Sequence, residues 1–305
     1  MFLGIDIGGT NVKFGVIDEN YNIIKKYSIP TGAKRSADEV LSDICDKAKE
    51  IALEFSIERV GIGCPGRIDQ KNGVCISAGN LPFKGVSVSG VVSNALGVPA
   101  SMANDARCAV CGELHAGAGR EVDSFVMMTL GTGVGGGIVI NKKLHFGKNG
   151  GAGELGHMIV DMNGEDCKCG QRGCLEHYAS VTALIRQTEA AARENPESLL
   201  ARMCENGATG RTAFDAKRDG CPVGTAVVDK YIEYIAVGIM SVLRVLQPEA
   251  VVIGGAISNE GDNLILPLRE KVKSKYPVMI VASELKNDAG LIGAVAMGRE
   301  NAKGE

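Results

Sequence analysis

The chain has 305 residues, a net charge of -3, 45% hydrophobic residues and 23% charged residues. This length is enough for two domains of ordinary size, and the composition is typical of a globular protein, which excludes a disordered chain. The longest apolar runs are too short to cross a bilayer, the charge offers no general attraction to nucleic acid, and the N-terminus lacks the pattern of a secretory signal. We therefore expect a cytoplasmic protein without membrane or nucleic-acid partners.

The N-terminal segment predicts a strand at residues 2–7, a turn at Gly8-Gly9-Thr10 and a second strand at residues 12–17. A glycine turn lets backbone N–H groups approach an anion, and Asp6 and Thr10 could orient a phosphate and water bound to Mg²⁺. The same glycines also suit an ordinary hairpin. Neither the P-loop spacing nor the G-x-G-x-x-G spacing of dinucleotide sites occurs here.

A helix is predicted to begin after Ser36, because Ser36 and Glu39 form a capping box ahead of an apolar stripe that runs to Phe55. A short apolar strand follows at residues 60–63. The resulting order of strand, strand, helix and strand is typical of an α/β domain.

A second unit with the same plan is predicted from residue 125 onward. Residues 125–130 read as a strand, Gly131-Thr132-Gly133 as a turn, and residues 136–140 as the next strand. After a long helical pattern at residues 225–246, a buried strand meets Gly254-Gly255. Two copies of one plan indicate a duplicated fold, although two hairpins could also arise independently. The second turn is another phosphate candidate, with Gly254-Gly255 near the adenosine.

Asn104 and Asp105 lie between an extended segment and a helical one. A pair of this kind at such a junction is most often a helix N-cap, and position alone favours that interpretation. The alternative is catalytic: Asp105 accepts the proton of a sugar hydroxyl that attacks a γ-phosphorus, while Asn104 holds a neighbouring hydroxyl. The residues alone leave both open.

A metal site is predicted at His157, Cys167, Cys169 and Cys174. Three thiolates and one imidazole complete a tetrahedral zinc shell, and the glycines between them let a short loop wrap the ion. Four protein ligands leave no position for water, which favours a structural zinc ion over a hydrolytic one.

The other cysteines are scattered, and a long chain without an export signal favours reduced thiols. We interpret these residues as small buried hydrophobic side chains. They are Cys45, Cys64, Cys75, Cys108, Cys111, Cys204 and Cys221.

Glu154 and Glu176 flank the predicted metal loop, and Asn80 lies in a predicted turn. By type, the two glutamates are solvated surface residues and Asn80 is a turn former. Attached to a loop that a metal ion holds in place, Glu154, His157 and Glu176 could instead present rigid acceptors to sugar hydroxyls.

Taken together, these motifs resemble the ROK family (repressor, open reading frame, kinase), and specifically its bacterial glucokinases. The likeness runs from Met1 to about Gly298, and its cysteine motif is the most specific part, because Asp-x-Gly-Gly-Thr also occurs across the wider actin-like ATPase superfamily. The segments that carry it are Asp6–Thr10, Asn104-Asp105, Leu130–Gly137, Gly153–His157 and Cys167–Glu176.

The resemblance implies an α/β fold of the actin-like ATPase (hexokinase, ribonuclease H-like) type, with two α/β domains and a cleft between them. It implies ATP and Mg²⁺ as cofactors, a structural Zn²⁺ ion, and transfer of the γ-phosphoryl group to the 6-hydroxyl of a hexose, with glucose as the first expectation. We expect domains at residues 1–117, joined by a C-terminal helix at about 287–305, and at residues 118–286.

The resemblance also implies roles for individual residues. Asp105 is the expected catalytic base. The expected sugar contacts are Asn80, Asn104, Asp105, Glu154, His157 and Glu176, with His157 also a zinc ligand beside Cys167, Cys169 and Cys174. The expected ATP contacts are Asp6, Gly8, Gly9, Thr10, Gly131, Thr132, Gly133, Gly254 and Gly255.

Two positions depart from the family pattern. Asn11 stands where a lysine is common, with Lys13 two positions further on, which puts a phosphate contact at this point in doubt. Phe83 stands where a tryptophan is common, and the ring still suits a packing role.

Three alternatives remain at the level of function. N-acetylmannosamine kinases share the motifs and differ in the pocket near the 2-position of the sugar. Family repressors carry an N-terminal helix-turn-helix, for which we expect no room before the strand at Phe2. A sensor that binds sugar without turnover is disfavoured by the presence of Asp105 and the glycine turns. By analogy with the family we expect a homodimer or homotetramer.

Overall fold

The computed structural model describes residues 1–272 and 276–303, and the chain divides into two compact units. The first unit comprises Met1–Arg120 and Asn287–Glu305, and the second Glu121–Lys286. The predicted C-terminal helix is present as α10 (Ala289–Lys303), and residues 304 and 305 of that prediction lie outside the described part. The domain boundaries after residues 117 and 286 stay a prediction. Within the described residues, every helix is too short or too polar to span a membrane.

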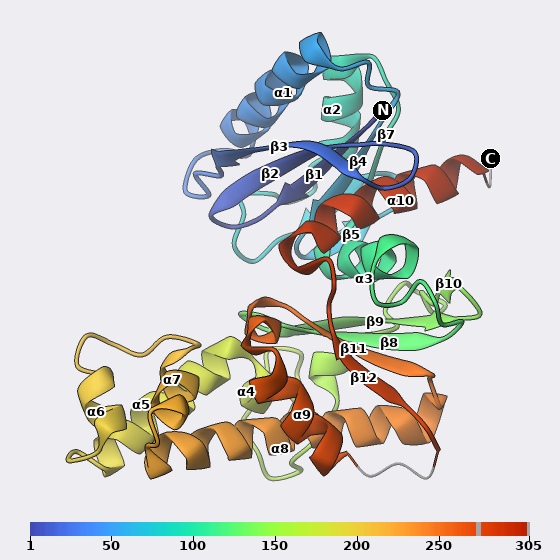
Figure 1. Ribbon diagram of the computed structural model, residues 1–305. Coiled ribbons are helices and arrows are strands. Elements are labelled where there is room, and N and C mark those ends of the chain that lie inside the picture. The colour runs from blue at the N-terminus through green and yellow to red at the C-terminus, as the bar shows by residue number, and fades with distance from the viewer. Residues whose placement is uncertain (273–275, 304–305) are drawn as a thin grey trace. The chain divides into compact units, whose positions relative to one another are not determined.

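The first unit is built on a five-stranded sheet in the order β3-β2-β1-β4-β7 (Figure 1). The central strand β1 pairs antiparallel with β2 and parallel with β4, and β4 pairs parallel with β7. The strands are β1 (Phe2–Ile7), β2 (Asn11–Ile17), β3 (Ile23–Pro30), β4 (Arg59–Cys64) and β7 (Ala100–Asn104), and a separate pair consists of β5 (Arg67–Asp69) and β6 (Val74–Ser77).

Helices cover both faces of this sheet. The helices α1 (Ala37–Glu54) and α2 (Val88–Leu96) lie on one face, and α3 (Asp105–Ala116) and α10 lie on the other (Figure 1). Glycines allow α10 to approach the strands directly, because a Cβ atom at Gly4 would lie 2.6 Å from the carbonyl oxygen of Leu291. A short 3₁₀ turn, η3 (Lys286–Asp288), lies ahead of α10.

The second unit repeats this topology, with the order β10-β9-β8-β11-β12. Its central strand β8 again pairs antiparallel with the strand that follows it and parallel with β11. Equal order and equal strand directions in both sheets confirm the duplicated plan predicted from the sequence. The strands are β8 (Phe125–Leu130), β9 (Val134–Ile140), β10 (Lys143–Leu144), β11 (Ala250–Gly254) and β12 (Met279–Ala282).

The core of the second unit forms around α8 (Pro222–Leu246), which begins three residues before the predicted Thr225 because Pro222 suits the first helical turn. The ring of Tyr231 is fully buried there, and its hydroxyl donates to the carbonyl oxygen of Ala179 at 2.8 Å. The other helices are η1 (Leu155–His157), α4 (Glu176–Ala179), α5 (Val181–Glu194), α6 (Leu199–Met203), α7 (Thr212–Arg218), η2 (Ala256–Glu260) and α9 (Asp262–Lys271).

Two strand predictions need correction. The first unit contains a further strand, β3, between the predicted hairpin and the first helix, so three strands precede α1. As an edge strand with exposed Lys25 and Lys26, β3 lacks the apolar alternation of a half-buried strand. β9 begins at Val134 instead of Gly136, because Thr129 of β8 already pairs with Gly135.

Candidate functional site

The first glycine turn connects β1 to β2, and Thr31, which follows β3, stabilises it through hydrogen bonds. The N–H of Gly8 donates to the carbonyl oxygen of Asn11 at 3.0 Å. The buried Thr31 hydroxyl donates to the carbonyl oxygen of Gly8 at 2.6 Å, and the Thr31 N–H donates to that of Thr10 at 2.9 Å. Two carbonyl groups of the turn are therefore already occupied by this threonine, a contribution that no motif in the sequence marks.

Asp6 precedes this turn and lies in a mostly buried environment. Its cross-strand partner Lys13 places Nζ 3.9 Å from Asp6 Oδ2, and the Asp6 side chain is 22% exposed. A Cβ atom at Gly290 of α10 would lie 3.3 Å from Asp6 Oδ2, so the helix backbone closes over the carboxylate. Burial, and to a smaller extent the charge of Asp105, raise the pKa of Asp6 to about 6, against the lowering effect of Lys13.

Asn104 takes one of the two roles considered for this pair, that of the helix cap. Asn104 is the N-cap of α3: Oδ1 accepts from the N–H groups of Ala106 at 3.1 Å and Arg107 at 3.3 Å. Asp105 is the first residue of the helix, and its Oδ1 accepts from Asn104 Nδ2 at 3.0 Å and from the Ala106 N–H at 2.9 Å. The capping interpretation therefore holds for Asn104, while the amide of Asn104 also orients the carboxylate of Asp105.

The structure brings these polar residues to one edge of the first sheet. Register pairs Asp6 with Gly63 and Cys64 with Asn104, so Asp6 and Asn104 both lie near the carboxyl ends of the parallel strands. This is the edge at which ligands bind in open α/β sheets.

Asn80 lies beside the first glycine turn. A Cβ atom at Gly9 would be 3.8 Å from the Cβ of Asn80, whose side chain is exposed. Phe83 of the same loop is buried at 1% exposure in the core, as expected for a packing ring.

Glu176 contacts the second glycine turn. Its Oε2 accepts the N–H of Val134 at 2.9 Å, and a Cβ atom at Gly133 would lie 2.2 Å from the same oxygen. The turn is also held by α5, because the Val181 N–H donates to the carbonyl oxygen of Gly131 and the Thr182 hydroxyl donates to that of Thr132, both at 2.8 Å. One predicted sugar contact therefore lies directly on a predicted nucleotide turn, and a side chain at Gly133 would displace its carboxylate.

The third glycine turn lies beside the second. Gly255 has a φ of 83°, and a Cβ atom there would lie 2.3 Å from the carbonyl oxygen of Leu130, the last residue of β8. A pocket of about 590 Å³ begins at the residue after this turn. Its lining includes Val181, Arg211, Ala256, Asn259 and Asn263, none of which the sequence motifs identified.

The four predicted metal ligands lie together, with their ligand atoms within 4.8 Å of one another. Cys167 Sγ is 3.7 Å from His157 Nδ1, and Cys169 Sγ is 3.6 Å from Cys174 Sγ. In a tetrahedral zinc site, bonds of ~2.3 Å to sulfur and ~2.0 Å to nitrogen separate two sulfurs by about 3.8 Å and a sulfur from a nitrogen by about 3.5 Å. The residues present therefore fit a zinc ion in both donor type and spacing.

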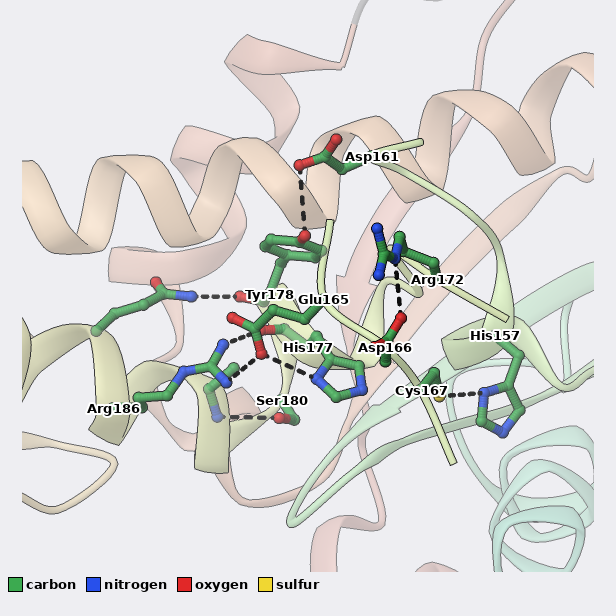
Figure 2. A network of polar contacts seen from close by, with 12 residues as sticks. His157, Asp161, Glu165, Asp166, Cys167, Arg172, His177, Tyr178, Ser180 and Arg186 are labelled. Atoms are coloured by element: carbon green, nitrogen blue, oxygen red, sulfur yellow. Dashed lines mark hydrogen bonds and ion pairs between the residues drawn. The ribbon is translucent and has the colours of Figure 1, made fainter. Parts of the chain in front are cut away.

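Ion pairs and hydrogen bonds hold the loop around these ligands (Figure 2). Arg172 Nε donates to Asp166 Oδ1 at 2.8 Å within the loop. Arg186 of α5 reaches Glu165 at 2.6 Å and ties the loop to the helix that also holds the second glycine turn. The sequence analysis assigned no role to any of these four residues, and the contact of Glu165 with Arg186 joins two separate segments.

Glu154 and His157 are placed by the short helix η1 against β9. A Cβ atom at Gly156 would lie 2.1 Å from the carbonyl oxygen of Val134, so the two backbones touch. The His157 N–H donates to the carbonyl oxygen of Glu154 at 3.1 Å, and the Glu154 side chain is exposed. Of the predicted residues, Glu154, His157, Glu176 and the last two glycine turns belong to the second unit, and Asp6, Asn80, Asn104 and Asp105 to the first.

Comparison with known proteins shows the family and the fold. The model of the ROK family matches residues 2–301. The glucokinase of Thermotoga maritima is 35% identical over 99% of this chain and 98% of the relative, and the N-acetylmannosamine kinase of Salmonella typhi is 32% identical over 97% of each. The structure of a ROK family glucokinase from Streptomyces griseus, in complex with glucose and AMPPNP, is 32% identical, with a TM-score of 0.85 over 98% of this chain and 99% of that one. These likenesses confirm the predicted α/β fold of the actin-like ATPase type.

Proposed function

Because the chain belongs to the ROK family, we propose that it is an ATP-dependent sugar kinase that phosphorylates glucose at the 6-hydroxyl, giving glucose 6-phosphate and ADP. The observation that carries this proposal is Asp105, a carboxylate at the N-terminus of α3 oriented by Asn104 at the carboxyl edge of the sheet. The glucokinase relatives, one of them solved with glucose and an ATP analogue, support the choice of glucose.

Asp105 acts as the general base. Its carboxylate accepts the proton of the sugar hydroxyl while the hydroxyl oxygen attacks the γ-phosphorus of ATP, and the bond to the β-phosphate oxygen breaks. The positive end of the α3 dipole favours the charged form of a carboxylate at this position. In phosphoryl transfer most of the work is positioning and charge stabilisation, so a single oriented base is sufficient.

The glycine turns hold the nucleotide in this proposal. Backbone N–H groups of Gly8–Thr10 and Gly131–Gly133 approach the phosphates, and Gly254-Gly255 together with the adjacent pocket receives the adenosine. Mg²⁺ would neutralise charge on the transferring phosphates, and Asp6 offers a carboxylate toward it or toward its bound water.

Six side chains are proposed to contact the sugar. Asn80, Asn104 and Asp105 belong to the first unit, and Glu154, His157 and Glu176 to the second. Cys167, Cys169, Cys174 and Nδ1 of His157 would hold a structural zinc ion, which would fix the imidazole and leave its other nitrogen for a sugar hydroxyl. Asn104 contributes chiefly by orienting Asp105, because its Oδ1 already caps the helix.

A coupled assay of ADP release over a panel of sugars with MgATP tests the proposal. We expect the highest kcat/KM with glucose, compared with mannose, fructose, N-acetylglucosamine and N-acetylmannosamine. A preference for an N-acetyl sugar would favour the N-acetylmannosamine kinase alternative, which the relative at 32% identity supports. The absence of ADP release with every sugar, alongside sugar binding by calorimetry, would point to a sensor instead of a kinase. Cytoplasmic localisation and assembly into dimers or tetramers stay predictions.

A further inference from the structure

A second group of metal-ligating side chains lies in the first unit, whereas the predicted zinc loop belongs to the second. It consists of Cys111 and His115 on α3 and Glu300 on α10. The three ligand atoms lie within 4.8 Å of one another, and His115 Nε2 is 2.9 Å from Glu300 Oε1. Neither the proposed kinase reaction nor the predicted zinc loop uses any of these residues.

Close packing of two helices creates this group. A Cβ atom at Gly293 of α10 would lie 1.6 Å from the carbonyl oxygen of Cys108, and one at Gly112 of α3 would lie 2.3 Å from that of Ala289. Glycines therefore allow the two helix backbones to touch, which fixes the position of one helix along the other. Cys111 and His115 are four residues apart and share one face of α3, so Glu300 is presented to both.

The group combines one buried metal-ligating side chain with two that solvent can reach. Cys111 is fully buried, whereas the side chains of His115 and Glu300 are 27% and 50% exposed. The ring of Tyr21 lies against the imidazole, with centroids 5.2 Å apart, and limits its movement. A cation can therefore reach the thiol from the side of the imidazole and the carboxylate.

We propose that Cys111, His115 and Glu300 form a second site for a divalent transition metal ion, with Zn²⁺ as the best match. A thiolate, an imidazole and a carboxylate are all accepted zinc ligands, and three protein ligands leave the fourth tetrahedral position for water. Binding releases the proton of the Cys111 thiol and joins α3 to α10. The site lies in the last turns of α3, where the helix dipole favours a cation.

The pair of His115 and Glu300 requires only a small adjustment. A tetrahedral zinc ion would separate the imidazole nitrogen and the carboxylate oxygen by about 3.3 Å, compared with the hydrogen bond of 2.9 Å now present. The ion would replace that hydrogen bond, and the exposed Glu300 side chain can adjust.

Metal analysis of the full chain tests the proposal. Wild type, His115→Ala and Glu300→Gln are stripped of metal, dialysed against buffered Zn²⁺ and analysed by mass spectrometry of metals. We expect both variants to bind one zinc ion fewer per chain than wild type. His145→Ala is the matched control, because this exposed histidine belongs to neither group, and it should bind as much zinc as wild type.

A second measurement distinguishes loss of the metal site from misfolding of a variant. With Co²⁺ in place of Zn²⁺, loss of the site removes part of the thiolate-to-cobalt absorption, while circular dichroism reports whether each variant is folded. Equal zinc content and equal cobalt spectra in wild type and both variants would overturn the proposal. The result is independent of kinase activity, so it does not depend on the proposed function.

Discussion

At the scale of single residues, Asp105 carries the most specific prediction. Asp105→Asn keeps the shape of the side chain but removes the proton acceptor, so we expect kcat to fall by about 10²- to 10⁴-fold while glucose affinity changes little. Steady-state kinetics and calorimetry measure the two quantities. Asp38→Asn is a matched control, because Asp38 also lies in the first turn of a helix, and it should leave kcat unchanged. Full turnover in Asp105→Asn would contradict the role of base.

Asp6 makes stability depend on pH in a defined direction. Its pKa rises from 3.8 in the unfolded chain to about 6 in the folded state. The folded state therefore binds the proton more tightly, and this stabilisation is fully present below pH 4 and is lost as the pH rises through 6. A shift of about two units corresponds to about 3 kcal/mol, and partial exposure makes ~2 kcal/mol a better expectation.

The comparison of wild type with Asp6→Asn isolates this effect. Urea unfolding without Mg²⁺ should show that the variant gains stability relative to wild type between pH 4 and pH 8. Other carboxylates titrate in the same range, but they contribute equally to both proteins. A difference in the free energy of unfolding that stays constant over this range would refute the prediction.

At the scale of elements, the metal loop depends on glycine at a specific point. Gly173 has a φ of 71°, and a Cβ atom there would lie 1.6 Å from the carbonyl oxygen of Asp161. Gly170, with a φ of 89°, has nothing within 4 Å of its Cβ position. Both alanine variants carry the strain of a left-handed residue, about 1–2 kcal/mol, but only Gly173→Ala also has the clash. We expect a lower thermal midpoint for Gly173→Ala than for Gly170→Ala, and equal midpoints would contradict the described loop.

The same loop is expected to lose its metal when one ligand is removed. Cys169→Ser should lower the zinc content measured by mass spectrometry and raise the KM for sugar, because His157 is no longer fixed. Cys204→Ser is the control, since Cys204 lies outside both groups of metal ligands and is also partly exposed. Unchanged zinc content in Cys169→Ser would exclude the cluster as the zinc site.

At the scale of the whole molecule, the two units depend differently on the C-terminal helix. The second unit is continuous in sequence, whereas the first is completed by α10, which packs directly on β1 and β4. A chain ending at Lys286 should keep slow hydrogen exchange in β8 and β11 and lose it in β1 and β4. Protection of β1 in the truncated chain would show that α10 is dispensable.

Much of this architecture follows from local patterns. The strand at Phe2–Ile7, the capping box at Ser36 and the strand at Phe125–Leu130 occur as predicted. Most of the scattered cysteines are buried, as expected for small apolar side chains. Strand β3 was not predicted, because an edge strand needs no regular apolar alternation.

The sequence by itself indicated several of the elements, the three glycine turns and the four ligands of the predicted zinc site, because each depends on residues close together in the chain. Only the tertiary structure decided that Glu176 lies on the turn at Gly133 and that Cys111 and His115 meet Glu300. It also showed that Asn104 caps α3 and orients Asp105. The contacts of Glu176 and of Glu300 join residues far apart in the sequence. Strand pairing and helix packing bring these residues together, and the spacing of residues along the chain does not predict such contacts.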